Sequence, residues 1–118
     1  MKFMKRIYIA GPLNATNSVD YIKNLHRMII IGNQIKSLGF AVFIPGIDFL
    51  VGLIDGSWNY EDYFTYSSSW LEVADAMFVL PKSDKSNGVS RELKIAESFN
   101  IPIFYDIDEL LEWNILKK

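Results

Sequence analysis

The stretch Ile7-Tyr8-Ile9-Ala10-Gly11-Pro12 places four apolar residues directly before a glycine and a proline. A short apolar run that stops in this way predicts a buried strand that ends in a sharp turn. Three comparable runs follow at residues 40–44, 76–80 and 101–105. Each of these runs predicts one further strand.

The segments between the apolar runs predict helices. These helices are expected over residues 19–37, 61–73, 89–98 and 107–113, whereas residues 47–60 show a mixed pattern. Apolar strands that alternate with helices indicate a parallel sheet covered by helices on both faces. We therefore expect one α/β domain over residues 1–118, a three-layer sandwich with a parallel sheet of four to five strands. Ligands of such sheets bind beyond the carboxyl ends of the strands.

The first predicted helix carries apolar residues at the spacing of a core-facing stripe. This stripe consists of Ile22, Leu25, Met28 or Ile29, Gly32, Ile35 and Leu38. Ile30 lies off the stripe and would face solvent in a monomer, which indicates a contact between subunits. We therefore expect a homodimer or a larger homo-oligomer.

The composition excludes several classes of protein. Twelve basic and fourteen acidic residues give a net charge of −2, which argues against binding to nucleic acid. The absence of cysteine and the single histidine exclude disulfides, thiolate catalysis and a structural zinc site. No apolar run reaches the length of a membrane span, and no signal-peptide pattern opens the chain. We expect a cytoplasmic protein that binds neither metal nor membrane.

Ser86-Asn87-Gly88 precedes the predicted helix over residues 89–98. Free amides at a helix N-terminus, next to a glycine, can bind an anion such as a phosphate. The same residues are also ordinary helix-capping chemistry, and the local pattern alone favours this simpler interpretation.

Glu92 is the strongest candidate for a functional residue. It falls inside the apolar stripe of its helix, one turn from Val89 and from Ala96. A carboxylate directed at the sheet becomes neutral, finds a partner or serves chemistry; alternatively, it leans out to water near the helix N-terminus. Arg91 points away from it on the helical wheel. The hydroxyl of Tyr8 is its natural partner, although a single tyrosine in a strand is more often a core residue than a catalytic one.

Aromatic residues are concentrated between residues 58 and 70. The segment holds six of the seventeen aromatic residues, with acidic residues close by. Aromatic faces beside carboxylates suit a flat nucleobase or a sugar, but they also suit packing on the sheet or on a partner. We expect Trp58 and Tyr60 near a ligand, and Phe64 and Trp70 directed inward.

Three motifs together resemble the nucleoside 2-deoxyribosyltransferase superfamily, which includes deoxynucleoside 5′-monophosphate N-glycosidases. They are residues 7–12, residues 70–75 (Trp-Leu-Glu-Val-Ala-Asp) and Ser86-x-Gly88-x-x-x-Glu92, followed by Ala96 and Ile101-Pro102-Ile103. The resemblance covers nearly the whole chain. It implies a flavodoxin-like fold, an oligomer, and cleavage of the N-glycosidic bond of a nucleoside 5′-monophosphate or nucleoside, by hydrolysis or base exchange. It implies no metal and no cofactor.

The resemblance also implies roles for individual residues. Glu92 would be the nucleophile, Tyr8 its orienting hydroxyl, and Ser86 and Gly88 the contacts to a phosphate. The expected substrate-binding residues are, besides these two, Gly11, Pro12, Trp58 and Asp48.

One position departs from the family's pattern. The relatives carry a catalytic aspartate where this chain has Ser67. We expect Asp62 to supply the acid in its place, with Asp55 and Asp48 as alternatives. If no residue does so, the chain is instead a non-catalytic nucleotide-binding module of the same fold.

Overall fold

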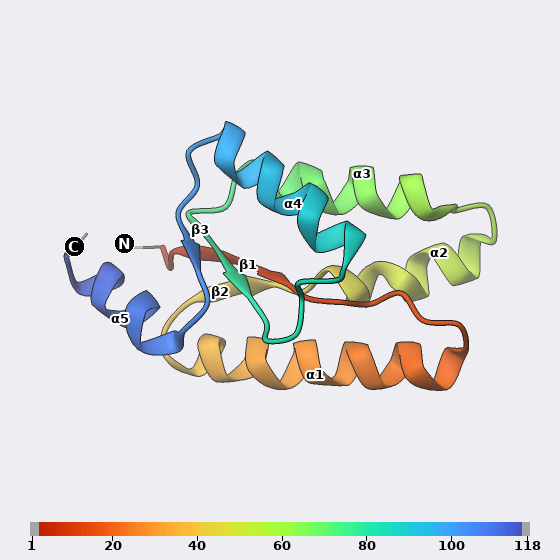
Figure 1. Ribbon diagram of the computed structural model, residues 1–118, viewed down its shortest axis with the longest axis horizontal. Helices are drawn as coiled ribbons and strands as arrows, with labels where there is room; N and C mark the ends of the chain where they lie inside the picture. Colours follow the sequence, from red (N-terminus) through yellow and green to blue (C-terminus); the bar gives the residue numbers. More distant parts are fainter. Residues whose placement is uncertain (1–2, 117–118) are drawn as a thin grey trace.

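Four parallel strands form a single sheet at the centre of the molecule (Figure 1). In spatial order they are β2 (Ala41–Phe43), β1 (Arg6–Ala10), β3 (Ala76–Val79) and β4 (Ile103–Phe104). In the computed structural model, which describes residues 3–116, Tyr8 of β1 pairs with Phe43 on one side and Met77 on the other. Each run that predicts a strand therefore contains one.

Helices cover both faces of the sheet. They are α1 (Ser18–Ser37), α2 (Phe49–Asp55), α3 (Tyr60–Leu71), α4 (Asn87–Ser98) and α5 (Ile107–Leu116), with a 3-10 turn, η1, at Pro45–Asp48. The four predicted helices are confirmed with small shifts at their ends. The architecture is a three-layer α/β sandwich of the flavodoxin-like type, in a single compact domain.

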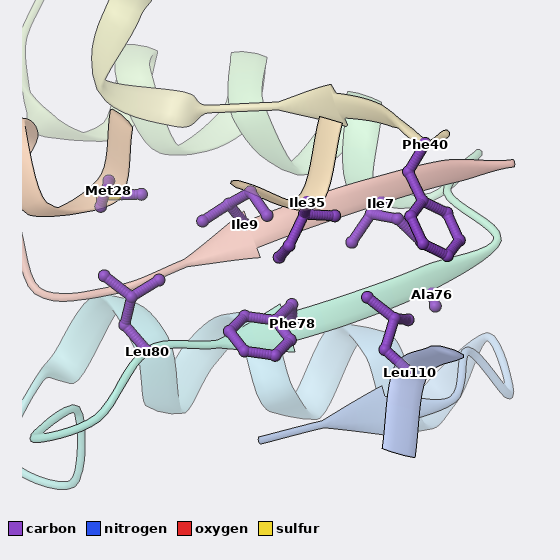
Figure 2. Close-up of a cluster of buried hydrophobic side chains, with 9 residues drawn as sticks. All are labelled: Ile7, Ile9, Met28, Ile35, Phe40, Ala76, Phe78, Leu80 and Leu110. Atoms are coloured by element: carbon purple, nitrogen blue, oxygen red, sulfur yellow. The ribbon is translucent and has the colours of Figure 1, made fainter. Parts of the chain in front are cut away.

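Alternate residues of β1 belong to two separate cores, because successive side chains of a strand point to opposite faces. Ile7 and Ile9 pack with Met28 and Ile35 of α1 and with Leu110 of α5 (Figure 2).

On the opposite face of β1, Tyr8 and Ala10 pack with Leu71 of α3 and with Val89 and Ala96 of α4. Glu92, between Val89 and Ala96, is thereby directed at the same face.

The predicted stripe of α1 is only partly correct. Met28, Gly32 and Ile35 are buried, but Ile22 and Leu38 are exposed. The twenty-residue helix is about 30 Å long, whereas a five-residue strand spans about 17 Å. The ends of α1 therefore extend past the sheet, and their apolar residues stay in solvent.

The helix α2 lies in the segment for which the sequence predicts no regular structure. It ends at Gly56, whose φ of 81° is in the left-handed region that favours glycine. A Cβ at Gly52 would lie 1.9 Å from the hydroxyl oxygen of Tyr63. The lack of a side chain at Gly52 therefore allows α2 to pack closely against α3.

No helix within residues 3–116 has the length and apolar content that crossing a membrane requires.

Candidate active site

A cavity of about 310 Å³ lies at the carboxyl edge of the sheet. Strands β1 and β3 end on the side of the molecule where α4 begins (Figure 1). The cavity is lined by Gly11, Leu13, Asn14, Tyr21, Met28, Pro45, Asp48, Trp58, Asn59, Tyr60, Tyr63, Phe64, Ser67, Ser86, Gly88 and Glu92. Its volume lies at the lower end of the range of small-molecule sites, about 300–1,000 Å³.

Glu92, which lines this cavity, forms a buried pair with Tyr8, which lies behind it in the core. Only 8% of Glu92 is exposed, and the hydroxyl of the fully buried Tyr8 donates a hydrogen bond to Glu92 Oε2. The two residues come from different layers, since Tyr8 belongs to the sheet and Glu92 to α4. The predicted contact between them is therefore present, and the alternative in which Glu92 points into solvent is wrong.

Burial alters the ionisation of both partners. Removal from water disfavours the charged form and raises the pKa of Glu92 to about 7, although the hydrogen bond from Tyr8 acts in the opposite direction. Burial, followed by the charge of Glu92, raises the pKa of Tyr8 well above its ordinary value. At neutral pH Tyr8 is therefore a neutral donor, and Glu92 changes readily between its acid and its carboxylate.

Asp48 is the second carboxyl group of the cavity. It ends η1, and its Oδ2 accepts a hydrogen bond of 3.2 Å from the hydroxyl of the buried Ser67 in α3. Burial raises the pKa of Asp48, and the hydrogen bond from Ser67 partly opposes this effect. A half-buried carboxyl group therefore faces the same space as Glu92.

The structure does not bring Asp62 or Asp55 to the cavity. Asp62 completes a capping box with Asn59 at the start of α3, in which its carboxylate accepts a 2.8 Å bond from the amide of Asn59. Asp55 is exposed and accepts bonds from the amide and the hydroxyl of Ser57. Both aspartates thus have local structural roles, and of the three expected sources of an acid only Asp48 lines the cavity.

An aromatic wall, formed by Trp58, Tyr60, Tyr63 and Phe64, lines one part of the cavity. The rings of Trp58 and Tyr63 lie 5.0 Å apart at 57°, and those of Tyr60 and Phe64 lie 6.3 Å apart at 21°. Trp58 and Tyr60, which are expected near a ligand, thus both line the cavity.

The inward position expected for Trp70 is wrong, since 49% of it is exposed. One face of its ring stacks on Phe43 at 5.9 Å, and Phe43 in turn stacks on Tyr8. Trp70 therefore covers the edge of the sheet from outside. Phe64, expected to pack inward, borders the cavity itself.

Ser86 caps α4, and its hydroxyl accepts a 3.2 Å bond from the amide of Val89. Ser86 and Gly88 also line the cavity, so the cap and the cavity share these residues. A Cβ at Gly88 would meet the hydroxyl of Tyr60 at 3.5 Å. Gly11 lines the cavity as well, whereas Pro12 is not among its lining residues.

Arg91 is directed away from Glu92, as the helical wheel predicts. Its guanidinium makes a bidentate pair with Glu61, at 2.7 and 3.2 Å, and lies 3.7 Å from the centroid of the Phe64 ring. These contacts join α4 to α3 and hold one side of the aromatic wall.

Tyr21 also lines the cavity, although it is not among the residues that the sequence predicts there. Burial, together with the charge of Asp48, raises the pKa of Tyr21 to about 12. Tyr21 stands four residues before Leu25 and seven before Met28, so helical spacing carries a signal for this position.

Within residues 3–116, no group of three or more His, Asp or Glu side chains is arranged to hold a metal ion.

Replacing Glu92 by glutamine is expected to stabilise the protein at alkaline pH. The pKa of Glu92 rises from 4.5 to about 7 on folding, so between these values the native state keeps a proton that the unfolded state releases. Wild-type stability therefore falls as the pH rises through this window, whereas the variant has no such loss. At pH 8 the free energy of unfolding should favour the variant by an amount on the order of 3 kcal/mol.

Urea unfolding at pH 8 and at pH 4 measures this difference. At pH 4, where Glu92 is protonated in both states, the two proteins should have nearly equal stability. Glu97→Gln, at an exposed position of the same helix, controls for the loss of a carboxylate from α4. An equal gain in stability for Glu92→Gln at both pH values would contradict the burial of a charge.

The part of the chain that contains the sheet and the cavity matches a known family. Residues 5–105 match the model of the family described as "Domain of unknown function (DUF4406)". No curated protein matches the chain significantly. The family match includes all four strands, Tyr8, Glu92 and every residue that lines the cavity.

Proposed function

This chain belongs to the DUF4406 family, and we propose that it cleaves the N-glycosidic bond of a nucleoside 5′-monophosphate through a glutamate nucleophile. The observation that carries this proposal is the buried contact between Tyr8 and Glu92 at a cavity that holds a second carboxyl group. The resemblance of the chain's motifs to the nucleoside 2-deoxyribosyltransferase superfamily supports the same chemistry.

Glu92 has one oxygen available for attack. Since Oε2 accepts the bond from Tyr8, Oε1 is the atom that reaches the anomeric carbon, C1′. Its lone pair forms a bond to C1′ while the bond from C1′ to the base breaks, which leaves a glycosyl ester on Glu92. Water then releases the sugar phosphate, or a second base replaces the first.

The two ends of the cavity suit the two ends of a nucleotide. The aromatic wall provides ring faces for stacking on a base. The start of α4 provides amides without intrahelical partners and the positive end of a helix dipole for the phosphate. Glu92 lies one helical turn beyond Gly88, about 6 Å along the axis, which places it near the sugar between these two ends.

A second function, non-catalytic nucleotide binding, is favoured by the serine at position 67. The superfamily resemblance implies a catalytic aspartate there, and a chain without a working acid would keep the nucleotide but not cleave it. This alternative uses the same cavity and predicts binding without turnover.

Release of free base from a panel of ribo- and deoxyribonucleoside 5′-monophosphates tests the proposal. Chromatography with and without a second base in the mixture separates hydrolysis from transfer. The N-glycosidase function predicts free base from at least one nucleotide. Tight binding without any release would contradict it and support the binding module.

We also expect the protein to form at least a homodimer. Leu50, Val51 and Leu53 of α2 are exposed, and Ile54 is 86% exposed, which is more apolar surface than a single helix of a monomer usually leaves in water. Sedimentation at micromolar concentration should show a dimer or a larger oligomer, and Ile54→Glu should shift it toward monomer. A wild-type protein that sediments only as monomer would contradict this expectation.

A further inference from the structure

We propose that Asp48 is the catalytic acid that protonates the departing base, and that Ser67 is the residue that positions it. This inference rests on the proposed N-glycosidase function and deepens it. It assigns the proton transfer to a side chain that ends η1, in a different element from the helix α4 that carries Glu92.

The first support is that Asp48 shares the cavity with the nucleophile. Among the residues that the structure describes, Asp48 and Glu92 are the carboxyl groups that line it. Cleavage of a glycosidic bond commonly uses two carboxyl groups, one that attacks the sugar and one that protonates the leaving group. The remaining acidic candidates, Asp55 and Asp62, are engaged in local hydrogen bonds outside the cavity.

The second support is the way in which Asp48 is held. The hydroxyl of Ser67 donates to Oδ2 of Asp48 across nineteen residues of sequence. Because Oδ2 is the acceptor in this bond, the proton of a neutral Asp48 sits on Oδ1. Burial favours this neutral form, since it raises the pKa of Asp48. Tyr21 and Tyr63, whose pKa values are raised by burial and then by the charge of Asp48, are neutral groups at neutral pH.

The third support is that the two carboxyl groups are held by different hydroxyl groups. Ser67 donates to Asp48, and Tyr8 donates to Glu92. Each carboxyl group therefore has its own donor, so that one can hold a proton while the other is a carboxylate.

The proposed reaction balances in two halves. In the first, Glu92 Oε1 bonds to C1′, the electron pair of the broken bond goes to the base, and the proton of Asp48 moves to a nitrogen of that base. In the second, the Asp48 carboxylate takes a proton from water as the water oxygen bonds to C1′. Glu92 leaves as a carboxylate, and both groups return to their starting forms with one water consumed.

The test compares substrates that do and do not need an acid. Asp48→Asn is expected to lower kcat for base release from a nucleoside 5′-monophosphate by about 10²- to 10⁴-fold, the usual contribution of a general acid. It should change kcat by less than about threefold for 4-nitrophenyl 2-deoxyribofuranoside 5-phosphate, whose leaving group departs without protonation. Ser67→Ala should lower kcat about tenfold for the nucleoside 5′-monophosphate and should leave kcat almost unchanged for the nitrophenyl substrate.

Matched controls separate this assignment from the proposed function. Asp62→Asn and Asp55→Asn remove the competing carboxyl groups and should leave both activities unchanged. Two outcomes would overturn the role of Asp48 and leave the proposed function standing, when wild type releases base and Glu92→Gln does not. One is an Asp48→Asn variant with full activity on the nucleotide. The other is an equal loss of kcat on both substrates. If wild type releases base from no nucleotide, the proposed function fails and Asp48 has no role as its acid.

Discussion

Glu92→Gln is expected to abolish base release, with a loss of kcat on the order of 10⁴-fold or more. An amide oxygen is a poor nucleophile, so the glycosyl ester cannot form at a useful rate. The fold should survive, because the glutamine oxygen can still accept the hydrogen bond that Tyr8 donates to Glu92. Loss of activity together with the expected gain in stability at pH 8 would separate chemistry from folding.

Glu97→Gln is the matched control for this loss. Glu97 lies on the same helix but is exposed, so its replacement should leave base release unchanged. A Glu92→Gln variant that keeps more than about a tenth of wild-type kcat would show that the reaction does not require a carboxylate at this position.

A nucleoside 5′-monophosphate is expected to bind at least 100-fold more tightly than the corresponding nucleoside. The dipole at the start of α4 contributes about 0.3–1 kcal/mol toward an anion. Each charge-assisted hydrogen bond from an amide, or from the Ser86 hydroxyl, adds roughly 1.5–3 kcal/mol. A 100-fold preference corresponds to a difference in binding free energy of about 2.8 kcal/mol. A single such bond together with the dipole already approaches this value.

Competition between a nucleoside and its monophosphate for the cavity measures this preference. Ser86→Ala should reduce the ratio of the two affinities about tenfold or more, since it removes one donor to the phosphate. The ratio is the quantity to compare, because loss of the cap also costs about 1 kcal/mol of stability. Ser90→Ala, at an exposed position of α4, is the control. Equal affinity for nucleoside and monophosphate would contradict a phosphate site at this helix.

The sheet and the buried pair were predictable because each leaves a local signal. An apolar run that ends at Gly11 and Pro12 indicates a buried strand wherever it occurs. A glutamate between Val89 and Ala96 interrupts an apolar stripe, and helical spacing alone places it on the face that meets the sheet. Tyr8 follows from the alternation of side chains along the same strand.

The contact between Asp48 and Ser67 left no such signal. It joins a 3-10 turn to the middle of α3, and no spacing rule relates residues in two such segments. The helix α2 was not predictable either, because exposed apolar residues surround Gly52 and give no clear division into a buried and a polar face. Asp48 is therefore expected at the cavity only through the family resemblance, as a substrate contact and as an alternative acid, whereas Asp62 is the acid expected first.

Trapping of the glycosyl ester tests the role of Glu92 most directly. The protein is mixed with a cleavable nucleoside 5′-monophosphate, quenched in acid during turnover, digested and analysed by mass spectrometry. We predict a sugar phosphate attached to the peptide that contains Glu92, and no such adduct in Glu92→Gln. An unmodified Glu92 peptide under conditions in which the protein releases base, or an adduct on another residue, would contradict a glutamate nucleophile at position 92.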